Sequence, residues 1–389
     1  MRNWLLPEYV EDVLPNEAAR MESLRRTLLD LFKVHGYEYV IPPMLEYLES
    51  LITGVGHDLD LATFKVVDQL TGRLMGVRAD TTPQAARIDA HVLNRKGVAR
   101  LCYAGSVLKT SPNGLAQTRE PIQVGAELFG HAGIESDVEI HRLMVKSLKA
   151  VGIQSLLVDF SHVGIFGSLI SQSKISAKLE QALYAALQSK DQPAVRELAG
   201  ALGALTRDAL CSLTELNGDM EVLDQAAAML PDNKEISQAL NDLRYVGSRL
   251  NDLGVEVCFD LSELRGYHYH SGIVFAAYAQ GCAGPLALGG RYDEVGQAFG
   301  RARPATGFSL DLRGVITALP PAKRAGAILA PWVDDASLQE TIDALRAGGH
   351  VVVQELPGHE QFRSELGCDR RLEKQGTQWH VVAAPELLN

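Results

Sequence analysis

Polar side chains alternate with apolar ones along residues 121–129, the segment PIQVGAELF. In a β-strand this alternation puts Gln123, Gly125 and Glu127 on one face, with the glycine between the two polar side chains. The gap above the glycine leaves room for a small polar ligand against the backbone. The alternative is a half-exposed strand with a solvated polar face, and this stretch taken alone favours that alternative.

Two other stretches carry residues that suit the same kind of ligand. In VRADTTPQAARIDA, Asp80 lies at an expected strand-to-helix junction, where Thr82 is a candidate N-cap. In RGYHYHSGIVF, Arg265 precedes an alternating aromatic segment that contains Tyr269 and His270. Acids bind an ammonium group, arginine binds a carboxylate through paired N–H groups, and aromatic rings form a wall. The set therefore suits a zwitterionic amino acid, although Asp80 could equally be a cap or turn residue only.

Composition and motifs exclude several other classes of protein. The chain has 389 residues, of which 46% are apolar and 22% are charged, as in an ordinary globular protein. It has no apolar run long enough to span a membrane and no signal-like N-terminus. We therefore expect a cytoplasmic protein. Its five cysteines are scattered without CxxC spacing, which predicts neither a metal site nor disulfides. No P-loop or dinucleotide fingerprint occurs, so we expect no cofactor. A net charge of −11 argues against a broad nucleic-acid surface.

The pattern of helices and strands predicts how these residues are positioned. Asn16 is expected to cap a helix that ends at Gly36, and Ser136 with Glu139 forms a capping box for another. A short helix is expected at 48–56, and a second helix is expected to run from the cap at Thr82 to about Asn94. Strands are expected at 37–41, 64–68, 74–78, 101–108, 121–129, 154–160, 255–260, 267–275, 287–293 and 305–311.

The texture of the sequence also predicts its domains. Residues 1–320 form a core that is interrupted at about 165–253 by an Ala- and Leu-rich insertion of five or six helices. A linker at Pro320-Pro321, with Lys323 and Arg324, leads to a small α/β domain at 325–389. That domain has strands at 327–330, 350–354, 370–373 and 378–382 and a helix at 337–347. It carries ten acidic and five basic residues, a balance that suits a protein contact better than RNA.

The order of these motifs resembles the catalytic core of class II aminoacyl-tRNA synthetases, and of histidyl-tRNA synthetase in particular. Residues 32–43 resemble motif 1, a dimer-interface element, and 103–127 resemble motif 2. Residues 77–83 resemble the segment that binds the amino group of histidine, and 265–275 the histidine-specific Arg-Gly-x-x-Tyr-Tyr signature. Residues 289–293 and 307–313 resemble the motif 3 region, with its arginine kept as Arg313.

The departures from that family concern the nucleotide. Motif 2 of a synthetase carries Phe-Arg-x-Glu, whose arginine holds the ATP α-phosphate, whereas this chain has Leu108, Lys109, Thr110 and Ser111. His270 replaces the second tyrosine of the aromatic signature, and the C-terminal piece is shorter than an anticodon-binding domain and acidic. The combination resembles the regulatory subunits of ATP phosphoribosyltransferase, which are synthetase paralogues, and RADTTPQAARI is typical of them.

This resemblance implies an α+β fold, with a six- or seven-stranded antiparallel sheet flanked by helices. It implies a non-catalytic subunit that activates the short-form catalytic subunit in the first step of histidine biosynthesis and mediates feedback inhibition by histidine. We expect a homodimer through residues 32–43 within a hetero-oligomer, without tRNA or a membrane. The histidine-binding residues carried over by position are Asp80, Thr82, Gln123, Glu127, Arg265, Tyr269 and His270. The alternatives are an active histidyl-tRNA synthetase-like ligase and a histidine-sensing module for another partner.

Overall fold

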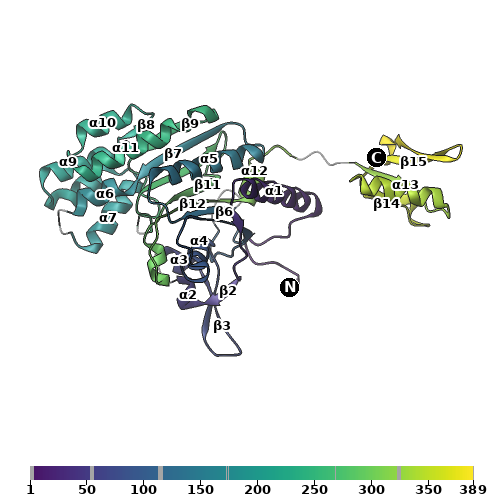
Figure 1. The fold of residues 1–389 in the computed structure, drawn as a ribbon, viewed down its shortest axis with the longest axis horizontal. Helices are drawn as coiled ribbons and strands as arrows, with labels where there is room; N and C mark the ends of the chain where they lie inside the picture. Colours follow the sequence, from purple (N-terminus) through teal and green to yellow (C-terminus); the bar gives the residue numbers. More distant parts are fainter. Residues whose placement is uncertain are drawn as a thin grey trace. The chain divides into compact units, whose positions relative to one another are not determined.

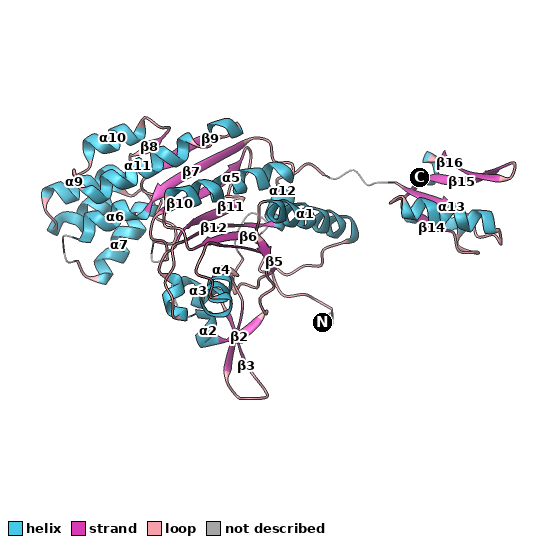
Figure 2. Cartoon of the chain, in the orientation of Figure 1, coloured by secondary structure: helices cyan, strands magenta, loops and turns pink. Residues whose placement is uncertain are grey.

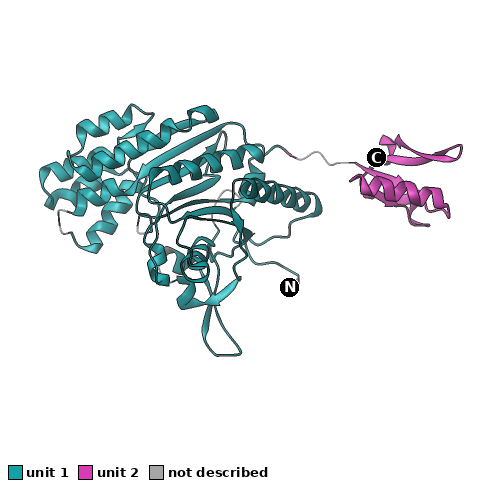
Figure 3. Cartoon of the chain, in the orientation of Figure 1, with its two compact units in different colours: residues 1–320 teal, residues 321–389 magenta. Residues whose placement is uncertain are grey.

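The computed structural model describes residues 4–52, 57–112, 117–171, 173, 175–267, 269–321 and 326–388. The chain divides into two compact units, Met1–Pro320 and Pro321–Asn389 (Figure 3). Each unit has its own sheet and its own apolar core. Among the described residues, no helix is both long enough and apolar enough to cross a membrane.

A nine-stranded mixed sheet organises the larger unit. Its strands follow the order β1-β5-β6-β12-β11-β10-β7-β9-β8, and all neighbours are antiparallel except the parallel pairs β1–β5 and β7–β9. The α+β class is therefore confirmed, but the sheet is larger than the expected six or seven strands and is not wholly antiparallel. The strands are β1 Glu38–Tyr39, β5 Ala99–Ser106, β6 Ile122–Phe129, β7 Leu156–His162, β8 Asn217–Gly218, β9 Glu256–Asp260, β10 Ile273–Ala279, β11 Ala287–Arg291 and β12 Ala305–Asp311.

Helices α1 (Pro15–Val34) and α5 (Ile134–Ala150) cover one face of this sheet (Figure 1). Leu28 and Phe32 of α1 are fully buried there and pack in one core with apolar residues of β6 and β7. The opposite face carries the polar residues of β6. It is approached by α4 (Thr82–Arg87), by the π-helix η1 (Ile88–Leu93), and by a small sheet of β2 (Leu45–Tyr47), β3 (Phe64–Val67) and β4 (Leu74–Val77).

Three expected helix caps are wrong, although the helices themselves form. The first helix begins at Pro15, one residue before Asn16, because proline is favourable in the first helical turn. Thr82 is likewise the first residue of α4 rather than its cap. The Ser136 hydroxyl lies within the first turn of α5 and donates to the Gly133 carbonyl at 2.7 Å, while Glu139 instead binds Arg100 at 2.7 Å. Short-range patterns locate a helix better than they locate its end.

The Ala- and Leu-rich region forms six α-helices among the described residues, as expected (Figure 2). They bury leucines such as Leu183, Leu210 and Leu240 in the same apolar cluster as Phe160 of the sheet. The helical region therefore shares its core with the sheet. The helices are α6 Val163–Ser171, α7 Ala177–Gln188, α8 Gln192–Leu198, α9 Ala204–Leu213, α10 Val222–Met229 and α11 Lys234–Ser248.

The expected strand at 267–275 forms only at its end, where β10 begins at Ile273. The residues before it form a tight turn. Gly266 has φ +65°, and its carbonyl accepts the backbone N–H groups of Tyr269 and His270, both at 2.8 Å. A left-handed glycine favours this turn over extension, so the aromatic residues lie on a loop. His268 lies outside the described residues.

The smaller unit has a four-stranded sheet of order β14-β13-β15-β16. Its core strand β13 (Ala327–Ala330) pairs in parallel with both neighbours, and helix α13 (Ala336–Ala347) packs against one face through Leu338 and Ile342. The remaining strands are β14 Val352–Gln354, β15 Cys368–Gln375 and β16 Gln378–Ala383. The expected strands and helix are present with boundary shifts, and Lys323 and Arg324 lie outside the described residues.

A buried ion pair fixes the α4–η1 segment to the sheet. Arg303, just before β12, donates to both carboxylate oxygens of Asp89 in η1, at 2.9 and 3.1 Å. The two side chains are 6% and 1% exposed, so neither charge is solvated. The pair holds in place the segment that begins with Thr82.

Replacing Arg303 with methionine should therefore lower the free energy of unfolding by about 3–5 kcal/mol, because Asp89 is left as a buried charge without its partner. Urea denaturation monitored by circular dichroism measures this. As a control, Arg26→Met removes an exposed pair with Glu22 and should cost less than about 1 kcal/mol. Equal effects of the two substitutions would contradict the assignment.

Candidate functional site

Glu127 lies on β6, an interior strand of the large sheet. Strand β6 runs between β5 and β12, where Glu127 is opposite Leu101 and Gly307. Its side chain is only 1% exposed. The solvated polar face that the isolated stretch favoured is therefore wrong, because β6 has a neighbouring strand on each side and its polar face is covered.

Three hydroxyl groups surround the Glu127 carboxyl. The Tyr103 hydroxyl donates to Oε1 at 2.9 Å, and the Thr82 hydroxyl donates to the same oxygen at 3.1 Å. The hydroxyl of Tyr292 donates to Oε2. These four residues come from β5, α4, β6 and the end of β11, so the sheet and α4 assemble the site together.

Burial raises the pKa of Glu127 to about 8, even though the tyrosine hydroxyls favour its ionised form. Near neutral pH the group is therefore mostly protonated. Because a protonated carboxyl can both donate and accept hydrogen bonds, it suits a ligand such as an imidazole, which also has one donor and one acceptor when neutral.

Asp80, Thr82 and Gln123 form the second part of the site. Asp80 Oδ1 accepts the backbone N–H of Thr82 at 3.0 Å and the side-chain amide of Gln123 at 2.8 Å. Gln123 Nε2 also donates to Ser309 Oγ at 3.1 Å. Both bonds to Asp80 end on one oxygen, and within the described parts of the chain the other oxygen makes none, so an ammonium group could bind there.

Glycines make room for these side chains on the sheet. A Cβ atom at Gly307 would lie 1.7 Å from Glu127 Oε2, and one at Gly125 would lie 2.5 Å from the Tyr103 hydroxyl oxygen. Neither distance is possible for real atoms. The network therefore requires glycine at both positions. The space expected above Gly125 exists, but the Tyr103 side chain fills it, so the expectation that it holds a ligand is wrong.

Tyr269 stacks on Tyr292, with ring centroids 5.2 Å apart and an interplanar angle of 29°. The Tyr269 hydroxyl is buried and has no hydrogen-bond partner among the described residues. A buried hydroxyl without a partner is unfavourable in a finished core. Its position beside the Glu127 network is consistent with a ligand that completes it.

His270 and Arg265 lie next to this network but do not bind Glu127. The His270 ring forms a hydrogen bond through Nδ1 with the Arg265 carbonyl at 3.2 Å, and burial lowers its pKa to about 4. The Arg265 guanidinium is 40% exposed and pairs with Glu263 at 3.2 Å. Both line a cavity of about 40 Å³ with Asp159. That cavity holds a few water molecules at most, so binding of an amino acid there would require side chains to shift.

Of the seven residues expected to bind the ligand, the structure joins Asp80, Thr82, Gln123 and Glu127 by hydrogen bonds. Tyr269 adjoins them through Tyr292, and the other two line the adjacent cavity. Sequence reasoning missed Tyr103 and Tyr292. Alternation along 101–108 places Tyr103 on one strand face, but Tyr292 follows Gly289-Gly290 without any local pattern that points to Glu127.

The residues that the synthetase resemblance assigns to ATP binding differ from the synthetase pattern more than those assigned to amino-acid binding. Lys109 stands where a synthetase has its phosphate-binding arginine, and a lysine lacks the planar fork. Arg313, which the resemblance assigns to motif 3, is buried, and its guanidinium lies 3.4 Å from a Glu11 carboxylate oxygen. Residues 113–116 of the intervening loop lie outside the described residues. The described residues also contain no cluster of three metal-ligating side chains.

Fold and site together define a histidyl-tRNA synthetase-like protein, and comparison with known proteins agrees. The family described as histidyl-tRNA synthetase matches residues 9–315. A solved structure described as an ATP phosphoribosyltransferase regulatory subunit/histidyl-tRNA synthetase from Bacillus halodurans superimposes with a TM-score of 0.79 at 27% identity, over 92% of this chain and 94% of that one. Histidyl-tRNA synthetase from Nostoc has the same fold, with a TM-score of 0.77 at 18% identity over 100% and 99% of the two chains.

Closer relatives distinguish between the synthetases and their paralogues. The chain is 69% identical to the ATP phosphoribosyltransferase regulatory subunit of Methylobacillus flagellatus over 100% of both chains. It is 56% identical to that of Cupriavidus necator, over 98% of this chain and 99% of the relative. Residues 325–382 match the ATP phosphoribosyltransferase subunit HisZ C-terminal domain. The chain therefore belongs to the family of ATP phosphoribosyltransferase regulatory subunits, and the family resemblance read from the sequence is confirmed.

Gly307→Ala should lower the free energy of unfolding by about 1–3 kcal/mol, because the added methyl group collides with Glu127 and with the Ala126 carbonyl. Chemical denaturation measures the change. Gly200→Ala is the control, since a Cβ there meets nothing within 4 Å, and it should leave stability unchanged or raise it by up to about 1 kcal/mol. A Gly307→Ala protein as stable as wild type would contradict the geometry.

The raised pKa of Glu127 also predicts a pH dependence. The folded protein binds a proton at this group between its ordinary value of 4.5 and about 8, and the unfolded chain does not. The contribution to stability is therefore full below pH 4.5 and is lost as the pH rises through 8. Glu127→Gln cannot titrate, so the stability of wild type relative to this variant should fall between pH 5 and 8. A constant difference in urea denaturation would refute the assignment.

Proposed function

We propose that this chain regulates an ATP phosphoribosyltransferase by assembling with a separate short-form catalytic subunit, and that histidine bound beside Glu127 provides the feedback signal. The observation that supports the proposal most strongly is a contrast between the residues suited to bind an amino acid and those expected to bind ATP. The residues suited to an amino acid form a connected network, while the arginine and glutamate of synthetase motif 2 are replaced by Lys109 and Ser111. A subunit that binds histidine without activating it is a sensor.

In the proposed complex, the ammonium group of histidine lies against Asp80, Thr82 and Gln123. The imidazole meets Glu127, with Tyr269 and His270 as its walls. Three observations support this pose. Among the described residues, the second carboxylate oxygen of Asp80 and the Tyr269 hydroxyl make no hydrogen bond, and the Glu127 carboxyl can donate or accept one.

Arg265 would bind the carboxylate of histidine after leaving Glu263. Because its pair with Glu263 is partly exposed, exchanging that partner for the ligand costs little. The cavity of about 40 Å³ must widen in the process, so binding requires a change in the residues around it. This requirement gives the ligand a means to favour one conformation.

Regulation then follows from linkage. If histidine binds one conformation of the assembled complex more tightly than another, the equilibrium shifts toward the first by the ratio of the two affinities. The catalytic subunit responds because its activity differs between the two conformations.

The proposed homodimer would form through residues 32–43. Val34 and Ile41 are each 78% exposed, and Tyr39 is 44% exposed, although all three are apolar or aromatic. Exposed apolar and aromatic side chains within one short segment suit an interface. The acidic C-terminal unit and the net charge of −11 favour assembly without tRNA.

The direct test of this function combines the purified chain with the catalytic subunit of an ATP phosphoribosyltransferase. Transferase activity should appear or rise on mixing and fall when histidine is added, while either protein alone shows neither effect. Histidine- and ATP-dependent pyrophosphate exchange by this chain, at an ordinary synthetase rate, would instead establish the ligase alternative. Histidine binding without any effect on the transferase would favour a sensor for another partner.

Asp80→Ala should weaken histidine binding at least about tenfold, because it removes the free carboxylate oxygen and releases Gln123. Isothermal titration calorimetry on the full chain measures the affinity. Asp191→Ala is a matched control, since Asp191 also accepts a backbone N–H, from Ala194 at 3.0 Å, but at the start of α8. Equal affinities for wild type and Asp80→Ala would place the ligand elsewhere.

A further inference from the structure

Strand β16 forms one edge of the C-terminal sheet. It pairs with β15 through residues 378–383, and within the described part of the chain nothing pairs with its other side. An open edge is a row of backbone N–H and C=O groups ready to accept a further strand.

The register identifies which groups face outward. The Ala384 N–H donates to the Asp369 carbonyl at 2.8 Å, just beyond the end of β16. In an antiparallel ladder the bonded positions alternate, so Val382 and His380 also bond to β15. Trp379, Val381 and Ala383 therefore turn their backbone N–H and C=O groups toward the open edge.

This edge lacks the usual protection against pairing. The segment QWHVVA contains no lysine, arginine, acid or proline, which are the residues that commonly block edge strands. Val381 is 39% exposed. The strand is also six residues long, enough for several hydrogen bonds to an added strand.

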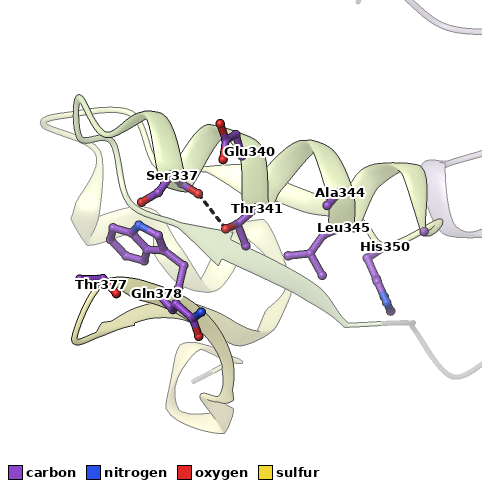
Figure 4. Close-up of a pocket in the computed structure, with 10 residues that line it drawn as sticks. Ser337, Glu340, Thr341, Ala344, Leu345, His350, Thr377 and Gln378 are labelled. Atoms are coloured by element: carbon purple, nitrogen blue, oxygen red, sulfur yellow. Dashed lines mark hydrogen bonds between the residues drawn. The ribbon is translucent and has the colours of Figure 1, made fainter.

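A groove of about 640 Å³ runs along the flank of α13 beside the start of this strand (Figure 4). Residues at helical spacing form its helical side, among them Thr341 and Ala344, and His350 lies toward one end. Gln378 and Trp379 of β16 form the opposing side. An open strand edge beside a groove is the geometry of β-strand addition, in which alternate side chains of an added peptide enter the groove.

We propose that an extended, basic segment of the catalytic subunit adds to the open edge of β16 and inserts side chains against the flank of α13. This rests on the proposed function, which supplies the partner. The charge balance favours a basic segment: residues 325–389 carry ten acidic and five basic residues, and Glu340 lines the groove. A second copy of this unit would bring the same negative charge, whereas a basic segment is attracted.

The test measures the affinity of the full chain for the catalytic subunit by analytical ultracentrifugation. Val381→Pro removes one outward N–H and should weaken binding at least tenfold. Val381→Thr keeps that N–H and the branched shape, so it should bind within about twofold of wild type. Raising the salt from 50 to 500 mM should weaken wild-type binding, because the attraction is partly electrostatic.

A second pair of variants leaves the strand untouched, in case proline disturbs the hairpin. Ala344→Trp fills the groove and should weaken binding at least tenfold. Ala347→Trp adds the same bulk on α13 outside the groove and should not.

The outcomes separate the two proposals. If wild type binds and activates the catalytic subunit but Ala344→Trp and a folded Val381→Pro bind as tightly, the edge is not the docking site, although the proposed function stands. If the variants change only self-association, the occupant is a second copy and this inference is wrong. If wild type does not bind the catalytic subunit, both proposals fail.

Discussion

The burial of one carboxyl group in the middle of a sheet is the constraint on which the site depends. Glu127 is 1% exposed and keeps its place because the hydroxyls of Thr82, Tyr103 and Tyr292 bind it. Those residues come from three separate parts of the chain. Gly307 must lack a side chain to leave room for the Glu127 carboxyl, and Gly125 to leave room for Tyr103. The sheet order, the position of α4 and its anchoring by the Asp89–Arg303 pair are therefore all requirements of one polar cluster.

The same cluster explains how a synthetase fold can serve regulation. Binding an amino acid needs the network around Glu127 and Asp80, whereas activating it needs groups that hold ATP. In the proposed function the chain keeps the first set and departs from the second at Lys109 and Ser111. Gln123 and Glu127 lie within strand β6, whereas Lys109 and Ser111 lie outside the strands of the sheet, so the proposed amino-acid site does not depend on the motif 2 loop. Family membership with regulatory subunits fits this separation.

Local patterns in the sequence predicted much of this arrangement, and the limits have physical causes. Alternation along 121–129 correctly put Gln123 and Glu127 on one face, because the alternation of side chains between the two faces depends only on the backbone of the strand itself. It could not show that the strand lies inside the sheet, since that depends on pairing with β12, about 180 residues later. Tyr292 was missed for the same reason. The segment before β10 was wrongly predicted to be a strand because its side chains alternate along 267–275. The single glycine before it, Gly266, has a positive φ that begins a turn instead.

The most direct measurement of the central claim is a structure of the chain determined with bound histidine. The account predicts an imidazole nitrogen within hydrogen-bond distance of the Glu127 carboxyl, the ammonium group at Asp80, and a cavity beside Arg265 wider than about 40 Å³. Histidine bound elsewhere, with the hydroxyls of Tyr103 and Tyr292 still closing over Glu127 and the Asp80–Gln123 bond unchanged, would contradict it.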